Sequence, residues 1–151
     1  SFDFEQKISN TKEIGNCVIK YPLLMKCNYQ DKKQKTIISN GKTVAIIKKK
    51  YKKIYIYPIK VTLFAFILEK KNIINLIRES KDIKINNNLI EFEFLKNKNN
   101  IKIFFDSNSL NLKGWETKDA YSNNVSFLIK NLEFNKKFTK DFFNIPKESD
   151  L

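Results

Sequence analysis

The chain carries few side chains that could do chemistry. It has sixteen carboxylates and two cysteines but no histidine. Histidine is the commonest general acid and base near neutral pH, so catalytic triads with an imidazole base are excluded. A structural zinc site is excluded as well, because its four ligands usually come from histidine and cysteine. The sequence therefore predicts no metal site and no cofactor.

The carboxylates do not converge on a pocket. Glu91 and Glu93 alternate with apolar residues, which places them on the solvent side of a strand. Asp106 and Asp119 fall at the ends of predicted strands, where a role in turns accounts for them. We therefore expect a protein that is not an enzyme.

The two cysteines, Cys17 and Cys27, are equidistant from Pro22, on which a predicted hairpin turn is centred. Residues at equal distances from a hairpin turn lie opposite each other on the same face of the sheet. A disulfide there would stabilise the fold by about 2 to 3 kcal/mol and would indicate an oxidising compartment. Two reduced, buried thiols remain the other interpretation.

The formal net charge is +13, which is typical of proteins that bind nucleic acid or anionic membranes. However, 28 of the 29 basic residues are lysine, whereas base readout and bidentate phosphate binding favour arginine. The lysines are spread over most segments, and the sharpest cluster, at residues 48–53, is predicted to be a solvated hairpin tip. We therefore predict no nucleic-acid partner, although such a tip could approach anionic lipid headgroups.

The prevailing pattern along the chain is the two-residue alternation of β-strands. Asn40–Gly41 predicts a type I′ hairpin turn, and no segment is apolar enough to span a membrane. About ten strands in a single domain, residues 1–151, predict a mainly β protein with one large antiparallel sheet that curls or partly closes. The predicted strands are Phe2–Ile8, Ile14–Lys20, Met25–Tyr29, Lys35–Ser39, Thr43–Lys48, Lys52–Tyr57, Leu89–Leu95, Ile101–Phe105, Leu110–Thr117 and Val125–Phe134.

One region breaks the alternation. Thr62–Glu69 is predicted to be a helix with Thr62 as its N-cap, and Lys71–Arg78 adds another turn or two. The helix is apolar almost all round, so it must be covered on more than one side, and the open mouth of a curled sheet offers that cover. Such a sheet has more apolar inner face than one short helix can cover. The apolar strand residues are therefore either plain core or the lining of a pocket.

Several motifs follow one another in a fixed order along the chain. They are Gly15–Pro22 with Met25–Tyr29, Ile37–Val44, Tyr57–Pro58 with Thr62–Leu68, Ile101–Asp106, Leu110–Trp115, Thr117–Asp119 and Phe142–Pro146. In this order, which runs unbroken from Phe4 to Pro146, the sequence resembles the LolA family of periplasmic lipoprotein carriers.

The resemblance implies a half-open β-barrel closed by a short helical lid. It also implies a monomeric periplasmic carrier, without its signal peptide, that moves lipoproteins from the inner to the outer membrane. Its partners would be the lipoprotein acyl chains, an inner-membrane ABC-type releasing complex, and an outer-membrane acceptor lipoprotein or the membrane itself. The expected residues are Phe92, Phe94, Ile103, Phe105, Trp115, Phe127 and Ile129 in the acyl-chain cavity, Leu63, Phe66 and Ile67 on the lid, and Tyr21, Pro22 and Met25 at the mouth, where partners would bind.

Some positions depart from the family pattern. Tyr21 stands where family members have the arginine that resembles a lid latch, which argues against a conventionally latched, closed state. The departure keeps a second function open, in which the same fold senses lipids or lipoproteins or delivers them directly to a membrane. For Met25 and Trp115, a plain core position is the other interpretation.

Overall fold

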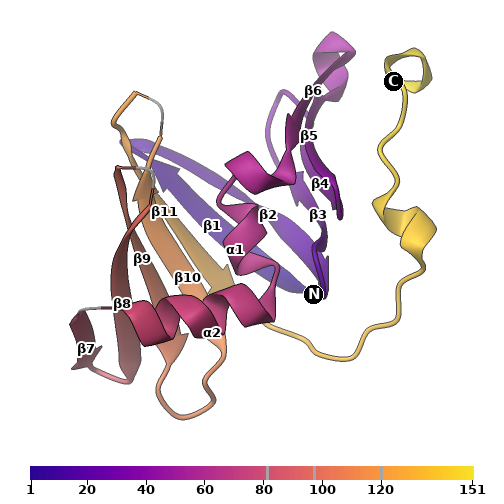
Figure 1. Ribbon diagram of the computed structural model, residues 1–151. Coiled ribbons are helices and arrows are strands. Elements are labelled where there is room, and N and C mark those ends of the chain that lie inside the picture. The colour runs from indigo at the N-terminus through magenta and orange to yellow at the C-terminus, as the bar shows by residue number, and fades with distance from the viewer. Residues whose placement is uncertain (81, 97, 120) are drawn as a thin grey trace.

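The structure is a computed structural model that describes residues 1–80, 82–96, 98–119 and 121–151. The described residues form one antiparallel sheet in the order β6-β5-β4-β3-β2-β1-β11-β10-β9-β8-β7. The edge strands β6 and β7 are not paired with each other, so the sheet curls without closing (Figure 1). This confirms the predicted mainly β fold with an open barrel. The strands are β1 (Phe2–Ile8), β2 (Thr11–Lys20), β3 (Leu24–Tyr29), β4 (Lys35–Asn40), β5 (Thr43–Lys48), β6 (Lys53–Pro58), β7 (Asp82–Asn86), β8 (Leu89–Lys96), β9 (Asn99–Asp106), β10 (Leu112–Lys118) and β11 (Asn124–Lys130).

The helices lie in three places along the chain. Figure 1 shows α1 and α2 on the concave side of the sheet, between its two arms. The helices and 3₁₀ turns are η1 (Lys49–Tyr51), η2 (Ile59–Val61), α1 (Phe64–Ile67), α2 (Lys70–Glu79), η3 (Lys140–Phe143) and η4 (Glu148–Asp150). We call residues 59–79, from η2 to α2, the lid segment.

The helix predicted at Thr62–Glu69 is shorter than expected. Thr62 is extended and is not an N-cap, because its hydroxyl donates backwards to the carbonyl oxygen of Ile59 at 2.8 Å. The extended backbone of Glu69 then separates α1 from α2. The longer helix is therefore α2, whose amphipathic pattern allows one face to be solvated while the other packs on the barrel.

Two strands are shorter than predicted, because residues with positive φ bound them. β10 begins at Leu112 because Leu110 has φ of 58°, within a turn in which the Asp106 carboxylate accepts bonds from the N–H groups of Asn108 and Ser109. Similarly, β11 ends at Lys130, before Asn131 with φ of 49°. The edge strand β7 was not predicted, although Ile83 and Ile85 alternate with polar residues in it, and all five of its residues are exposed.

The hairpin at Asn40–Gly41 exists, but its turn is not type I′. The two loop residues are Gly41 and Lys42, and only Gly41 has positive φ, at 95°. A type I′ turn needs positive φ at both loop positions, whereas a glycine at the first alone is typical of type II′. The Oδ1 atom of Asn40 accepts hydrogen bonds from the backbone N–H groups of Lys42 and Thr43, both at 3.0 Å.

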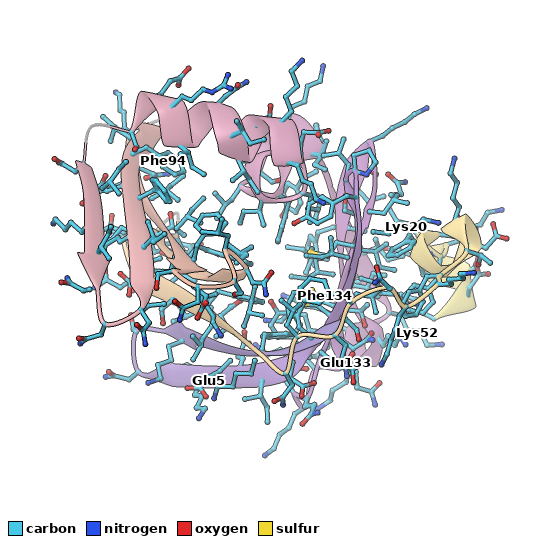
Figure 2. All side chains as sticks on the ribbon, turned by 90° about the horizontal axis from the view of Figure 1, so that it is seen from below. Glu5, Lys20, Lys52, Phe94, Glu133 and Phe134 are labelled. Carbon is cyan, nitrogen blue, oxygen red and sulfur yellow. A yellow bond between two sulfur atoms is a disulfide. The ribbon has the colours of Figure 1, made fainter. Side chains whose placement is uncertain are left out.

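The convex side of the sheet is covered by the C-terminal segment. Phe143 is 1% exposed and packs with Ile38, Ala45 and Ile47 of β4 and β5. The Lys20 ammonium donates to the carbonyl oxygen of Phe138 at 2.9 Å, on the side where Figure 2 shows the C-terminal segment. The opposite, concave side carries the larger apolar cluster. In the described part of the chain, no helix has the length and apolarity needed to cross a membrane.

Candidate functional site

A row of aromatic rings crosses the concave face. Trp115 of β10 stacks on Phe127 of β11, with centroids 4.1 Å apart and planes 6° apart. Phe127 stacks on Phe4 of β1 at 4.8 Å, and Phe4 meets Tyr29 of β3 edge-on at 4.7 Å. The row therefore links β10 and β11 to β1 and β3 through side-chain contacts, in addition to the backbone pairing of the sheet.

Gly15 makes the contact between Phe4 and Tyr29 possible. It lies on β2, between β1 and β3, directly opposite both aromatic residues. A Cβ at this position would lie 2.7 Å from the Phe4 ring and 2.1 Å from the carbonyl oxygen of Asn28. Because β2 has no side chain here, the Phe4 ring can lie across it and reach Tyr29.

Cys17 and Cys27 lie next to this row. They are paired in the register of β2 and β3 and joined by a disulfide, with their Cα atoms 4.1 Å apart. Both are buried on the concave face. The bridge thus places a fixed apolar surface in the floor of the barrel.

An inner cavity of about 280 Å³ lies between the aromatic row and the start of the lid segment. Leu63 and Phe64 cover it. Its lining residues are Phe2, Gln6, Cys17, Met25, Cys27, Tyr29, Lys35, Ile37, Ile46, Leu63, Phe64, Trp115, Val125 and Phe127.

The inner cavity is polar at one end only. The Tyr29 hydroxyl donates to Gln6 at 3.0 Å, and the Lys35 ammonium lies 2.7 Å from Glu13 and 3.8 Å from the Tyr29 ring centre. Burial raises the pKa of Tyr29, and the nearby Glu13 and Asp31 carboxylates raise it further. These polar groups are therefore partnered with one another, and the rest of the wall is apolar.

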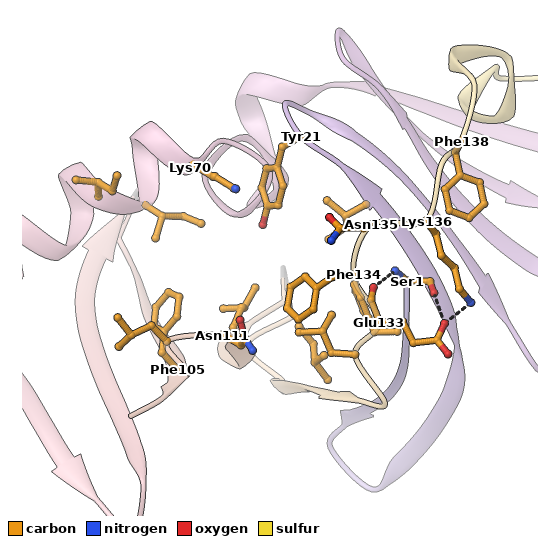
Figure 3. A pocket seen from close by; sticks show the side chains of 18 of the residues that line it. Ser1, Tyr21, Lys70, Phe105, Asn111, Glu133, Phe134, Asn135, Lys136 and Phe138 are labelled. Atoms are coloured by element: carbon orange, nitrogen blue, oxygen red, sulfur yellow. Dashed lines mark hydrogen bonds and ion pairs between the residues drawn. The ribbon is translucent and has the colours of Figure 1, made fainter. Parts of the chain in front are cut away.

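A larger mouth cavity, of about 560 Å³, opens at the other end of the barrel (Figure 3). This volume lies within the ~300–1,000 Å³ typical of small-molecule sites. One wall is α2 and the opposite wall is the segment 132–138 that follows β11. The lining residues are Ser1, Phe2, Ile19, Tyr21, Lys70, Ile73, Ile74, Ile77, Phe105, Leu110, Asn111, Leu112, Ile129, Leu132, Glu133, Phe134, Asn135, Lys136 and Phe138.

Apolar and polar residues separate within the mouth cavity. The α2 wall presents Ile73, Ile74 and Ile77, while Glu133 and Lys136 form an ion pair on the opposite wall. Figure 3 shows this pair at one side of the opening. Hydrogen bonding to Lys136 lowers the pKa of Glu133. The cavity could therefore hold an apolar chain while its charged groups stay near solvent.

The lid segment is tied to the turn between β2 and β3. The Leu23 N–H donates to the carbonyl oxygen of Leu68 at 2.8 Å. The Lys70 ammonium lies 4.9 Å from the ring centre of Tyr21, and burial raises the pKa of that tyrosine. Tyr21 thus contacts the lid segment. It occupies the position at which the family pattern has an arginine.

The two cavities bring together a subset of the predicted residues. Phe105, Ile129 and Tyr21 line the mouth cavity. The predicted residues that line the inner cavity are Trp115, Phe127, Leu63, Met25, Cys17 and Cys27.

The other predicted residues line neither cavity. Phe92, Ile103 and Ile67 are buried, Phe94 and Phe66 are half-buried, and Pro22 is exposed. Phe94 packs at the margin of the concave cluster (Figure 2). The predicted role of Met25 as a partner contact at the mouth does not agree with its position in the structure. Its side chain is 2% exposed, because β3 turns it toward the concave face, where it packs as core.

Sequence reasoning missed two parts of the mouth cavity. The isoleucines of α2 at positions 73, 74 and 77 have helical spacing, which could have identified them. Segment 132–138 has no regular structure, whereas alternation wrongly extended the last predicted strand to Phe134 and gave no signal beyond it. Among the described residues, no cluster of three or more cysteine, aspartate or glutamate side chains could hold a metal ion.

Comparison with known proteins adds one finding to this geometry. Residues 1–146 match the family model described as "Outer membrane lipoprotein carrier protein LolA". No curated protein matches the chain.

Proposed function

Because the chain belongs to the LolA family of outer membrane lipoprotein carriers, we propose that it carries lipoproteins across the periplasm, with their acyl chains against the concave face. The observation that carries this proposal is the mouth cavity. It joins an apolar sheet face to the isoleucines of α2.

The energetics explain why a carrier of this form is needed. Burying one methylene group is worth about 0.8 kcal/mol, so a sixteen-carbon chain exposed to water costs about 12 kcal/mol. A lipoprotein with several such chains cannot cross an aqueous compartment unaided. A carrier must supply an apolar cavity, yet release its cargo afterwards. An aliphatic and aromatic wall with few directional hydrogen bonds suits both needs.

The lid segment provides a boundary that could yield to cargo. Ile74 is 50% exposed, and the contacts of the segment with the β2–β3 turn include a backbone hydrogen bond and a cation–π contact. We propose that acyl chains enter between α2 and segment 132–138. The inner cavity would extend the site when Leu63 and Phe64 move.

The proposed donor is an inner-membrane ABC-type releasing complex. The proposed acceptor is an outer-membrane lipoprotein or the membrane itself. Tyr21 and Pro22 are exposed at the β2–β3 turn and are proposed to contact these partners. No catalytic step is proposed.

A single substitution in the α2 wall tests the proposal. We expect Ile74→Glu to weaken binding of a synthetic triacylated lipopeptide at least ~10-fold, because a carboxylate would be buried beside the acyl chain. Native mass spectrometry of protein titrated with the lipopeptide measures the bound fraction.

Asn75→Glu is the matched control. It places the same charge on the same helix at an exposed position that does not line the cavity. Its affinity should stay within about twofold of the parent, as is usual for surface substitutions. Equal affinity of the Ile74→Glu protein and the parent would contradict the proposed site.

A further inference from the structure

Seven lysines gather at one end of the sheet, where the β3–β4 loop meets the β5–β6 hairpin. The two loops touch, since the Lys50 N–H donates to the carbonyl oxygen of Lys33 at 3.4 Å. We call this group the lysine tip. Its members are Lys32, Lys33, Lys48, Lys49, Lys50, Lys52 and Lys53.

The charge of the lysine tip is not neutralised by neighbouring carboxylates. Within the described parts of the chain, none of the seven ammonium groups forms an ion pair. The carboxylates of Asp31 and Glu148 are engaged by backbone N–H groups, those of Lys35 and Ile54, both at 2.9 Å, and two carboxylates leave the seven lysines with an excess of positive charge. The tip therefore projects a positive potential into solvent.

Exposed tyrosines stand among these lysines. Tyr51 and Tyr55 are 52% and 44% exposed. The Lys48 ammonium lies 5.2 Å from the Tyr55 ring centre, and that of Lys50 lies 6.0 Å from the Tyr51 ring centre. Tyrosine and lysine both combine an apolar body with a polar end, which suits the interface between lipid headgroups and acyl chains.

The lysine tip lies at the polar end of the inner cavity. Lys48 is paired in register with Lys35, which lines that cavity. Figure 1 shows the β5–β6 hairpin projecting at the end of the sheet away from α2. A surface bound by the tip would therefore face the end of the barrel opposite the mouth cavity.

We propose that the lysine tip docks the protein on a bilayer surface rich in anionic phospholipid. The ligand chemistry is the phosphate of the headgroup, which lysine binds as a point charge without the bidentate fork of arginine. A convex hairpin with exposed tyrosines suits a flat, partly apolar interface better than the concave face of an acidic protein. The proposal rests on the carrier function for its biological purpose, but membrane binding is measured without cargo.

Vesicle sedimentation tests the proposal on the full chain. Vesicles of equal parts phosphatidylcholine and phosphatidylglycerol should bind the protein, and vesicles of phosphatidylcholine alone should not. Binding should fall as salt is raised, because the attraction is electrostatic. The triple variant Lys49→Gln/Lys50→Gln/Lys52→Gln should bind the anionic vesicles roughly 100-fold more weakly. Each lysine near such a surface contributes about 1 kcal/mol, and a tenfold change in affinity corresponds to about 1.4 kcal/mol.

The matched control is Lys84→Gln/Lys98→Gln/Lys137→Gln, which removes the same charge from exposed positions elsewhere. It should keep most of the binding. Equal loss in both triple variants would overturn the proposal, as would absence of binding to anionic vesicles. Equally tight binding to soluble polyglutamate would assign the tip to acidic protein partners instead. The triple tip variant should still bind the lipopeptide, so failure of docking is distinguishable from failure of the carrier function.

Discussion

At the scale of single residues, Glu5 joins three neighbouring strands at the centre of the sheet. It lies on β1, and its carboxylate accepts bonds from Lys130 of β11 at 2.8 Å and Lys12 of β2 at 3.0 Å. Hydrogen bonding to Lys130 and then Lys12 lowers the pKa of Glu5 from 4.5 to about 2. Bonds from Ser109 and Asn123 lower the pKa values of Asp106 and Asp119 in the same way.

These shifts predict acid sensitivity. An acid whose pKa is lower in the folded state stabilises the fold at pH values above its unfolded pKa, and this contribution is lost as the pH falls. For Glu5 the loss runs from about pH 4.5 down to about pH 2. Urea unfolding should therefore show Glu5→Gln less stable than the parent at pH 7, with the difference vanishing near pH 2. Glu116→Gln, at an exposed position on β10, is the control for the loss of one carboxylate, and its stability at pH 7 should stay close to that of the parent.

At the scale of elements, the C-terminal segment acts as a cover for the convex side of β3 to β5. Phe143→Ala would leave a cavity among Ile38, Ala45 and Ile47. We expect it to lower the free energy of unfolding by about 3 to 5 kcal/mol, as is usual for a fully buried phenylalanine. Urea unfolding followed by the fluorescence of Trp115 measures the effect. A loss below about 1 kcal/mol, the size of an ordinary surface change, would contradict the packing of this segment. Lys140→Ala, at an exposed position in η3, is the control.

How well each element could be predicted depended on the regularity of its burial. The strands with one buried face were placed to within a few residues, because alternation records which side meets the core. β7 was missed although Ile83 and Ile85 alternate with polar residues in it, because the strand has only five residues and its alternation does not mark a buried face. The break between α1 and α2 depends on the extended backbone at Glu69, which helix periodicity does not reveal.

The candidate site follows the same rule. Alternation placed Phe105, Trp115, Phe127 and Ile129 on one face, and they do share the concave face. Which of them line a cavity depends on how the lid segment and segment 132–138 lie across the sheet. These are long-range packing relations, so local sequence patterns could not separate cavity residues from core residues such as Ile103.

At the scale of the whole molecule, the curled sheet gives each end of the barrel a different character. The mouth cavity lies between α2 and segment 132–138, whereas the lysine tip adjoins the polar end of the inner cavity. The disulfide joins β2 to β3, and the C-terminal segment packs on β4 and β5. Both features lie on the part of the sheet away from α2. The disulfide and the C-terminal cover therefore lie apart from the α2 wall that the proposed cargo would contact.

Photocrosslinking tests the central claim most directly, namely that acyl chains bind on the concave side of this sheet. A triacylated lipopeptide with a diazirine in one acyl chain would be bound, irradiated and mapped by peptide mass spectrometry. We expect adducts on the wall of α2 at residues 73–77 and on concave-face residues such as Phe105 and Ile129, all removed by excess unlabelled lipopeptide. Adducts confined to the convex side, at Phe142, Phe143 and Ile145, would contradict this claim.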